Sequence, residues 1–137
     1  MARNADHMHL IEVHSIDWQR FQSLFLPGAR LGEAGAEENG KPQISFRSVD
    51  EWLRAIKPLS TSGTNREVIY KMRVEQFGNI ASVFYSHSAI FADKGKTDDV
   101  RRVNLCQMPF DGRRWWVTSV IWNDSPKKWD LPPDMEP

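Results

Sequence analysis

Large apolar side chains in the first third of the chain recur with the period of a helix. Between Asp17 and Pro27 they are Trp18, Phe21, Leu24 and Phe25. Their spacing of three or four residues places them on one helical face, with Asp17 as the N-cap and Pro27-Gly28 as the end of the helix. A shorter apolar run, Met8–Val13, is interpreted as another helix of about two turns.

A capping box predicts a further helix. In Ser48-Val49-Asp50-Glu51, the hydroxyl and the second carboxylate can each accept a hydrogen bond from an N–H group that the first helical turn leaves unpaired. The helix that follows carries Trp52, Leu53 and Ile56 on one face and ends at Pro58.

From Arg66 onward, apolar and polar residues alternate, which is the period of a β-strand. Simple alternation would bury Val68, Tyr70, Met72 and Val74 on one face. The predicted strands are Ala29–Glu33, Gln43–Phe46, one from Arg66 to the Phe77-Gly78-Asn79 turn, Ile80–Phe91, Val103–Phe110 and Trp115–Trp122, the last two joined by an Asp111-Gly112 turn. Helices first and an antiparallel meander second indicate an α+β class, with one sheet face buried on the helices. We expect a single domain over residues 1–137, with a mobile acidic loop at 32–42 and a mobile Pro-rich tail at 124–137.

Charge and cysteine content narrow the classes of partner. Eighteen Lys and Arg residues balance eighteen Asp and Glu residues, so no basic excess supports binding to nucleic acid or to an anionic membrane. Cys106 is the only cysteine, which excludes an internal disulfide, and its place in a predicted strand indicates a buried, inert thiol. No apolar run approaches the roughly 20 residues that a membrane-spanning helix needs. We expect a cytoplasmic protein.

Neither metal nor cofactor binding has a convincing motif. His7, His9 and His14 are close in sequence, but no carboxylate completes an obvious metal triad with them. The glycines form neither a phosphate-binding loop nor a dinucleotide fingerprint. We therefore expect no metal and no cofactor. Arg101-Arg102 and Arg113-Arg114 are interpreted as solvated strand ends rather than an anion site.

The order of several motifs resembles the SnoaL-like branch of the nuclear transport factor 2-like superfamily, over about residues 15–124. The motifs are Asp17-Trp18 followed by Phe21, Leu24, Phe25, Pro27 and Leu31; Phe77-Gly78-Asn79-Ile80-Ala81; and Asn104 followed by Asp111-Gly112-Arg113-Arg114-Trp115-Trp116-Val117. The resemblance implies a cone-shaped, curved antiparallel or mixed sheet wrapped around N-terminal helices. The superfamily includes isomerase-like, dehydratase-like and cyclase-like enzymes together with non-catalytic binding or dimerisation modules, so the fold leaves the activity open.

Two departures from the resemblance affect the candidate site. The stretch before Asp17 is shorter than the usual first helix of the superfamily. Where dehydratase-like members hold a Tyr-Asp pair, this chain has Val13-His14, so their acid–base carboxylate is absent. A His of those enzymes aligns approximately with Glu67, and another falls near His87.

His87 and Glu67 are the candidate catalytic residues. His87 has the parity of Ala81 and Val83, which the resemblance places on the inner face, where an imidazole can act as a general base. The alternative is a histidine that is hydrogen-bonded within the core. Glu67 could pair with His87 or polarise a water molecule if it points into the cone, whereas simple alternation turns it to solvent unless a bulge intervenes.

A larger set of residues is expected to bind substrate or to wall the pocket: Tyr70, Asn104, Tyr85, Phe84, Trp18 and Trp52. Asn104 offers a neutral donor and acceptor that suit a carbonyl or hydroxyl ligand. The alternative interpretation, a buried amide with a structural role, fits the sequence equally well. The alternative for the aromatic residues is that they pack in the hydrophobic core, as aromatic residues at helix or strand spacing usually do. Asp17 is read as a helix cap rather than as a catalytic acid.

The sequence therefore supports two hypotheses about function. The leading hypothesis is a domain that binds a hydrophobic small molecule in a mostly apolar pocket and supports cofactor-independent proton transfer of isomerase, dehydratase or cyclase type on a carbonyl or hydroxyl compound. The alternative is a non-catalytic dimerisation or partner-binding module. Both faces of Trp115–Trp122 are apolar, which predicts a homodimer through the outer face of the sheet.

Overall fold

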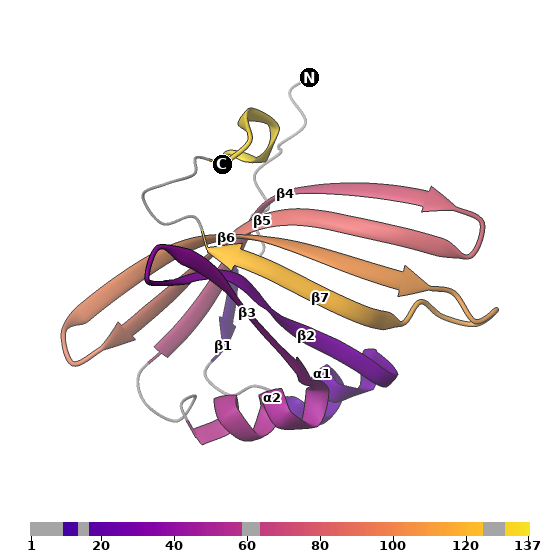
Figure 1. Ribbon diagram of the computed structural model, residues 1–137, viewed down its shortest axis with the longest axis horizontal. Coiled ribbons are helices and arrows are strands. Elements are labelled where there is room, and N and C mark those ends of the chain that lie inside the picture. Colours follow the sequence, from indigo (N-terminus) through magenta and orange to yellow (C-terminus); the bar gives the residue numbers. More distant parts are fainter. Residues whose placement is uncertain (1–9, 14–16, 59–63, 125–130) are drawn as a thin grey trace.

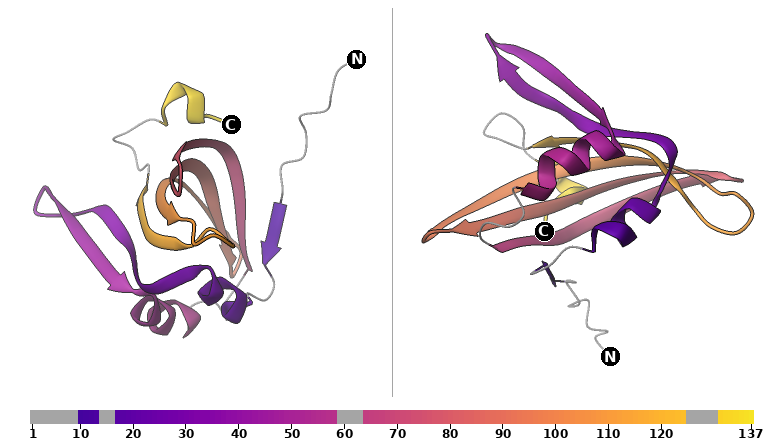
Figure 2. Two further views of the ribbon diagram at one scale, coloured as in Figure 1. Left: turned by 90° about the vertical axis from the view of Figure 1, so that its right-hand side faces the viewer. Right: turned by 90° about the horizontal axis from the view of Figure 1, so that it is seen from below.

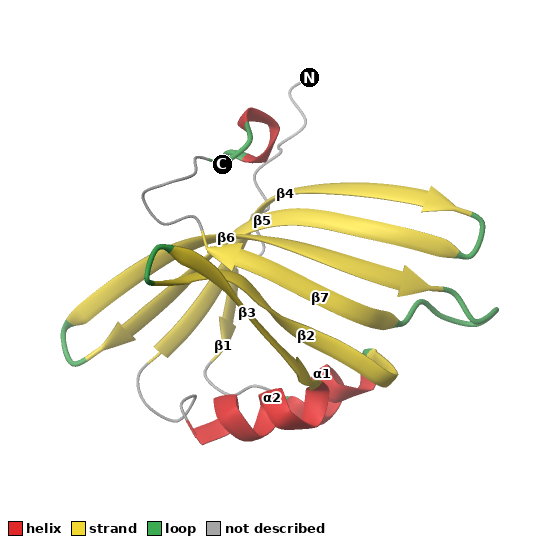
Figure 3. Ribbon diagram, in the orientation of Figure 1, coloured by secondary structure: helices red, strands yellow, loops and turns green. Residues whose placement is uncertain are grey.

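One curved sheet with two helices beside it forms the structure (Figure 1; Figure 3). The computed structural model describes residues 10–13, 17–58, 64–124 and 131–137. The helices are α1 (Trp18–Ser23), α2 (Val49–Ile56) and a short 3-10 helix, η2 (Pro133–Met135). The strands are β1 (Leu10–Val13), β2 (Phe25–Glu38), β3 (Lys41–Ser48), β4 (Thr64–Phe77), β5 (Ile80–Asp93), β6 (Lys96–Pro109) and β7 (Val117–Asp124).

The strands follow the order β1-β4-β5-β6-β7-β2-β3, and the β2–β7 pair alone is parallel among the described pairs. The sheet curls, with α1 and α2 on its concave side and η2 against its convex side (Figure 2). The α+β class and the curved mixed sheet predicted from the sequence are therefore confirmed.

Both predicted helix starts are present. The Asp17 side chain accepts a hydrogen bond from the Arg20 N–H (3.0 Å), and Ser48 with Glu51 forms the reciprocal capping box. The two helices meet through aromatic rings, because Phe21 stacks on Trp52 with ring centroids 5.3 Å apart. Helix α2 ends at Ile56, two residues before the predicted end at Pro58.

Three segments of the N-terminal half differ from the sequence prediction. Helix α1 ends at Ser23 rather than at Pro27-Gly28, which lie in strand β2. Leu10–Val13 forms strand β1 rather than part of a helix, because it pairs with Asn65–Val68 of β4. Residues 32–42 are mostly strands of the β2–β3 hairpin, which turns at Asn39-Gly40, rather than a loop. Here Gly32 is required, because a Cβ atom would lie 2.0 Å from the Ser45 carbonyl oxygen on β3.

A β-bulge at Tyr70 divides the apolar side chains of β4 between the two faces. Ile69 pairs with His87 and Lys71 pairs with Ser86, so Tyr70 is the extra residue. Val68, which pairs with Ser88, is buried on the convex side, whereas Met72, which pairs with Tyr85, lies on the concave side and is exposed. The prediction of one buried face along β4 was therefore wrong.

The described end of the tail, residues 131–137, packs on the convex face. Leu131 and Met135 are buried, and the Ser86 hydroxyl donates to the Met135 carbonyl oxygen over 2.6 Å. Asp134 also forms an ion pair with Arg73 of β4 (2.8 Å). For these residues the expected mobile tail is replaced by a docked segment. It covers part of the face through which a homodimer was predicted, and that homodimer stays a prediction.

Within the described residues, no helix combines the length and the apolar character needed to cross a bilayer.

Candidate functional site

Strand β5 carries the candidate site on one face and the docked tail on the other. Ser86 contacts the tail on the convex side, and successive side chains of a strand point to opposite faces. Tyr85 and His87 therefore face the concave side, on which the helices lie. Asn104 of β6 pairs directly with Tyr85 and shares that side.

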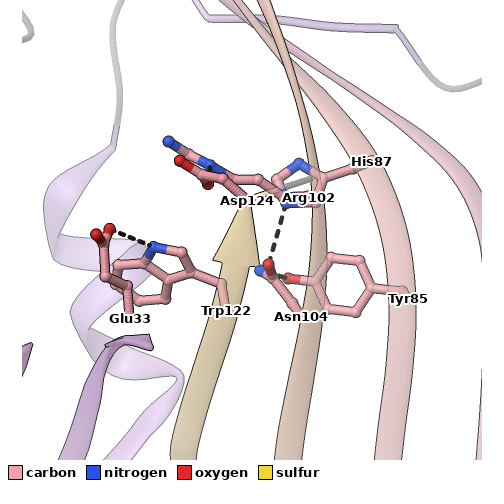
Figure 4. Close-up of polar contacts among 7 residues, drawn as sticks. All are labelled: Glu33, Tyr85, His87, Arg102, Asn104, Trp122 and Asp124. Carbon is pink, nitrogen blue, oxygen red and sulfur yellow. Dashed lines mark hydrogen bonds and ion pairs between the residues drawn. The ribbon is translucent and has the colours of Figure 1, made fainter. Parts of the chain in front are cut away.

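Three of the predicted site residues form one hydrogen-bonded chain (Figure 4). The Asn104 Nδ2 donates to the Tyr85 hydroxyl over 2.8 Å, which fixes the orientation of the amide. The Asn104 Oδ1 then lies 3.2 Å from His87 Nε2 and accepts from it. The Tyr85 and His87 ring centroids are 5.6 Å apart. The amide therefore holds both rings in fixed relative positions.

The other ring nitrogen of His87 lacks a hydrogen-bond partner in the part of the chain that the structure describes. His87 is 3% exposed, and its Nδ1 is buried without a hydrogen-bond partner among the described residues. With Nε2 donating to Asn104, Nδ1 of the neutral ring carries a lone pair and can only accept. Leaving such a group unsatisfied costs about 1–3 kcal/mol, so the fold keeps this acceptor at the expense of stability.

Tyr85 is the complementary donor. Burial is the main cause that raises the pKa of Tyr85 to about 12, and the neighbouring Cys106 and Glu67 act in the same direction against the hydrogen bond from Asn104. The phenol is therefore protonated at neutral pH. Because its oxygen already accepts from Asn104, its own hydrogen remains to be donated to another group.

Two polar pairs beside this chain were not predicted. Arg102, which pairs with His87 across the β5–β6 ladder, binds Asp124 through a 2.6 Å contact and is thus more than a solvated strand end. The Trp122 indole N–H donates to Glu33 of β2 over 3.2 Å. Arg102 and Asp124 lie on the consecutive strands β6 and β7, whereas Glu33 and Trp122 lie on β2 and β7, which are distant in sequence (Figure 4).

The remaining predicted residues are spread over other parts of the fold. Glu67 pairs with Ala89 and so shares the concave side with His87, but it is exposed. Tyr70 contacts Ser88, and Phe84 lies under Arg73, so both are on the convex face and do not wall the site.

The predicted tryptophans of the site belong to the helices. Trp18 and Trp52 contact each other, with ring centroids 6.3 Å apart, in the aromatic cluster of α1 and α2. That cluster accounts for both residues through helix packing.

Two surface hollows lie elsewhere. One, of about 650 Å³, is at the far end of the β4–β5–β6 meander next to Phe77 and Met108, and the other, of about 460 Å³, lies between Phe25 and Val49. His87 lines neither of them. Within the described residues, no three His, Cys, Asp or Glu side chains converge as metal ligands, and His7, His9 and His14 lie outside those residues. The amide, phenol and imidazole of the site suit an organic ligand with hydroxyl or carbonyl groups.

Comparison with known proteins identifies the fold. No family model and no curated protein matches the sequence. Among solved structures, a protein described as the beta subunit of an aromatic-ring-hydroxylating dioxygenase from Novosphingobium aromaticivorans superposes with a TM-score of 0.64 at 14% identity, over 80% of this chain and 76% of that one. A protein described as a ketosteroid isomerase from Shewanella frigidimarina gives a TM-score of 0.54 at 19% identity, over 75% and 78%.

A third similar structure has a different role. It is described as a calcium/calmodulin dependent protein kinase II association domain from Xanthomonas campestris, with a TM-score of 0.59 at 15% identity over 80% of this chain and 75% of that one. The chain has the cone-shaped, nuclear transport factor 2-like fold. At these identities the likeness concerns the fold alone, and it includes both a protein named as an enzyme and one named as an association domain.

Proposed function

We propose that the concave face binds a neutral, hydrophobic small molecule through His87, Asn104 and Tyr85. The observation that carries this proposal is the buried, unpartnered Nδ1 of His87. Buried polar atoms are normally paired, so an unpaired acceptor at the end of a built hydrogen-bond chain is best explained by a ligand that supplies the missing donor. The motif resemblance to SnoaL-like proteins supports the same reading.

The hydrogen-bond chain favours one class of ligand. At one end the His87 Nδ1 accepts, on the part of the ring that does not face Asn104, and at the other end the Tyr85 hydroxyl donates (Figure 4). A compound that carries a hydroxyl or an acidic C–H a few bonds from a carbonyl can satisfy both ends. The Arg102–Asp124 ion pair places opposite charges beside each other, which leaves the site suited to an uncharged ligand.

The same arrangement supports proton transfer without a cofactor. In the proposed step, His87 Nδ1 takes a proton from the carbon or hydroxyl next to the carbonyl, and the electron pair moves toward the carbonyl oxygen. The Tyr85 O–H donates to that oxygen and stabilises the charge that develops there. Return of the proton from Nδ1 to another atom of the same ligand completes an isomerisation. Asn104 is a positioning residue, because it holds both rings. Glu67, exposed on the same side, is a secondary candidate that the step does not use.

The two tyrosines of the chain provide a matched test. Apolar aryl hydroxyketones are titrated against the wild type, Tyr85→Phe, His87→Gln and Tyr70→Phe by calorimetry, together with mass spectrometry of any compound that co-purifies. We expect binding to weaken by about tenfold or more in Tyr85→Phe and His87→Gln. Tyr70→Phe, which loses a hydroxyl on the convex face, should bind like the wild type. Equal loss in both Tyr variants, or no binding and no co-purified compound in the wild type, would overturn the proposal.

A second candidate, a non-catalytic association module, is favoured by a different observation, the open edge of strand β4.

A further inference from the structure

Among the described residues, one edge of the sheet has no partner strand along most of its length. Strand β4 runs from Thr64 to Phe77, yet within the described residues β1 pairs only with Asn65–Val68. Beyond that point, residues 69–77 have β5 on one side and no described strand on the other. Unpaired backbone groups along a strand edge are a template for pairing with another chain.

The side chains of this open edge are unusually exposed and apolar for a surface. Met72 is 57% exposed and Val74 is 54% exposed, and Phe77 at the hairpin tip is more exposed still. The opposite edge of the sheet, β3, holds Pro42, and proline protects an edge from pairing because it has no backbone N–H group. Residues 69–77 contain no proline.

The hairpin geometry fixes which backbone groups point outward. Phe77 and Ile80 close the two-residue turn at Gly78-Asn79 and so form a hydrogen-bonded pair. Hydrogen-bonded and non-hydrogen-bonded pairs alternate along an antiparallel ladder. Residues 73, 75 and 77 therefore direct their backbone groups to β5, and Met72, Val74 and Gln76 direct theirs outward.

We propose that this edge pairs with the same edge of a second copy of the chain, antiparallel, about a two-fold axis at Val74. In this register Arg73 of each copy lies opposite Glu75 of the other, and Met72 lies opposite Gln76. The Arg73 and Glu75 pairs are non-hydrogen-bonded pairs, in which the facing side chains come closest. Lys71 lies opposite Phe77, which lets the aliphatic stem of the lysine cover an exposed ring.

Two other registers place like charges opposite each other. A two-fold axis at Arg73 puts the two Arg73 side chains face to face, and an axis at Met72 puts Lys71 opposite Arg73. Like charges directly opposite in a ladder are destabilising. The axis at Val74 avoids both repulsions and brings Met72 and Val74 of the two copies together on the concave side. Among these three registers, the charge pattern therefore favours the axis at Val74, and the facing Arg73 and Glu75 support a second copy as the partner.

This interface differs from a homodimer through the convex face, and it does not depend on ligand binding. The test measures the dimer dissociation constant of the full chain by sedimentation velocity up to about 100 µM, a range that suits a small interface. Val74→Lys places two lysines on the two-fold axis and should weaken the dimer by about tenfold or more. The matched control is Ile44→Lys, because Ile44 is 79% exposed on the other edge strand and should leave dimerisation unchanged.

A charge exchange tests the register itself. Because Arg73 also binds Asp134 of its own chain, the charge exchange is made in an Asp134→Asn background. In that background Glu75→Arg alone should weaken the dimer, and Arg73→Glu combined with Glu75→Arg should restore it, because each pair is then rebuilt with its signs reversed. A dimer that survives Val74→Lys uses another face and overturns the proposal. A double variant as weak as Glu75→Arg overturns the register at Val74. A full chain that is monomeric throughout, and that dimerises only after residues 1–9 are removed, would assign the edge to the chain's own N-terminal segment instead.

Discussion

Replacement of Met135 by alanine should destabilise the protein, because this side chain anchors the C-terminal segment. Met135 is 2% exposed and lies against β5, where its carbonyl oxygen accepts from Ser86. Truncation of a buried methionine to alanine costs about 2–5 kcal/mol. The neighbouring residues Pro133 and Asp134 are exposed, so the surroundings can close on the vacated space. We therefore expect the lower end of the range, about 2 kcal/mol.

The matched control is Asp134→Asn in the same segment. It removes the ion pair with Arg73, but both side chains of that pair are about half exposed, and surface ion pairs contribute about 0–1 kcal/mol. Urea unfolding followed by tryptophan fluorescence measures both variants, since six tryptophans report on the fold. A Met135→Ala change no larger than that of Asp134→Asn would show that residues 131–137 do not pack on the sheet in solution.

Two further predictions concern titratable groups. The Trp116 indole N–H, followed by the backbone N–H groups of Arg114 and Arg113, lowers the pKa of Asp111 to about 2. Because the pKa is lowered in the folded protein, the stabilisation from Asp111 is present above about pH 4 and is lost as the pH falls toward 2. The difference in Tm between the wild type and Asp111→Ala should therefore shrink between about pH 4 and about pH 2. A constant difference in Tm would contradict the hydrogen-bond network around Asp111. Burial raises the pKa of Cys106 to about 11, so a thiol reagent at pH 8 should label the native protein slowly and the urea-unfolded protein rapidly; rapid labelling of the native protein would contradict the buried placement.

The features predictable from the sequence were those that short segments determine. The Asp17 cap, the Ser48–Glu51 capping box and the turn at Gly78 depend on neighbouring residues, and the structure contains all three. The α+β class followed from the change of apolar period near Arg66. The placement of His87 on the inner face followed from the family resemblance, and the β5–β6 ladder has no register shift near it. The sequence did not predict which face Asn104 occupies.

The features that could not be predicted depend on distant partners. The run Leu10–Val13 fits a short helix or a strand equally well, and pairing with β4 decides the outcome. The bulge at Tyr70 inverts the side-chain parity of β4 without any glycine or proline to mark it, which moved Tyr70 away from the site. The Arg102–Asp124 pair requires the β6–β7 register, which no local motif specifies.

The parallel pairing of β2 with β7 has a consequence for the order in which the protein folds. Glu33 and Trp122, which meet across this pair, are 89 residues apart in the sequence. Contacts at such separation form late, because the intervening chain must first be ordered. On the ribosome, β2, β3 and both helices emerge well before β7. Leu31, almost fully buried in the finished sheet, can then pair with Arg47 of β3 but lacks its second neighbouring strand until β7 has been made. We expect the β4–β6 meander to form first, closure of the cone by β7 to set the folding rate, and chains that stop before Val117 to aggregate.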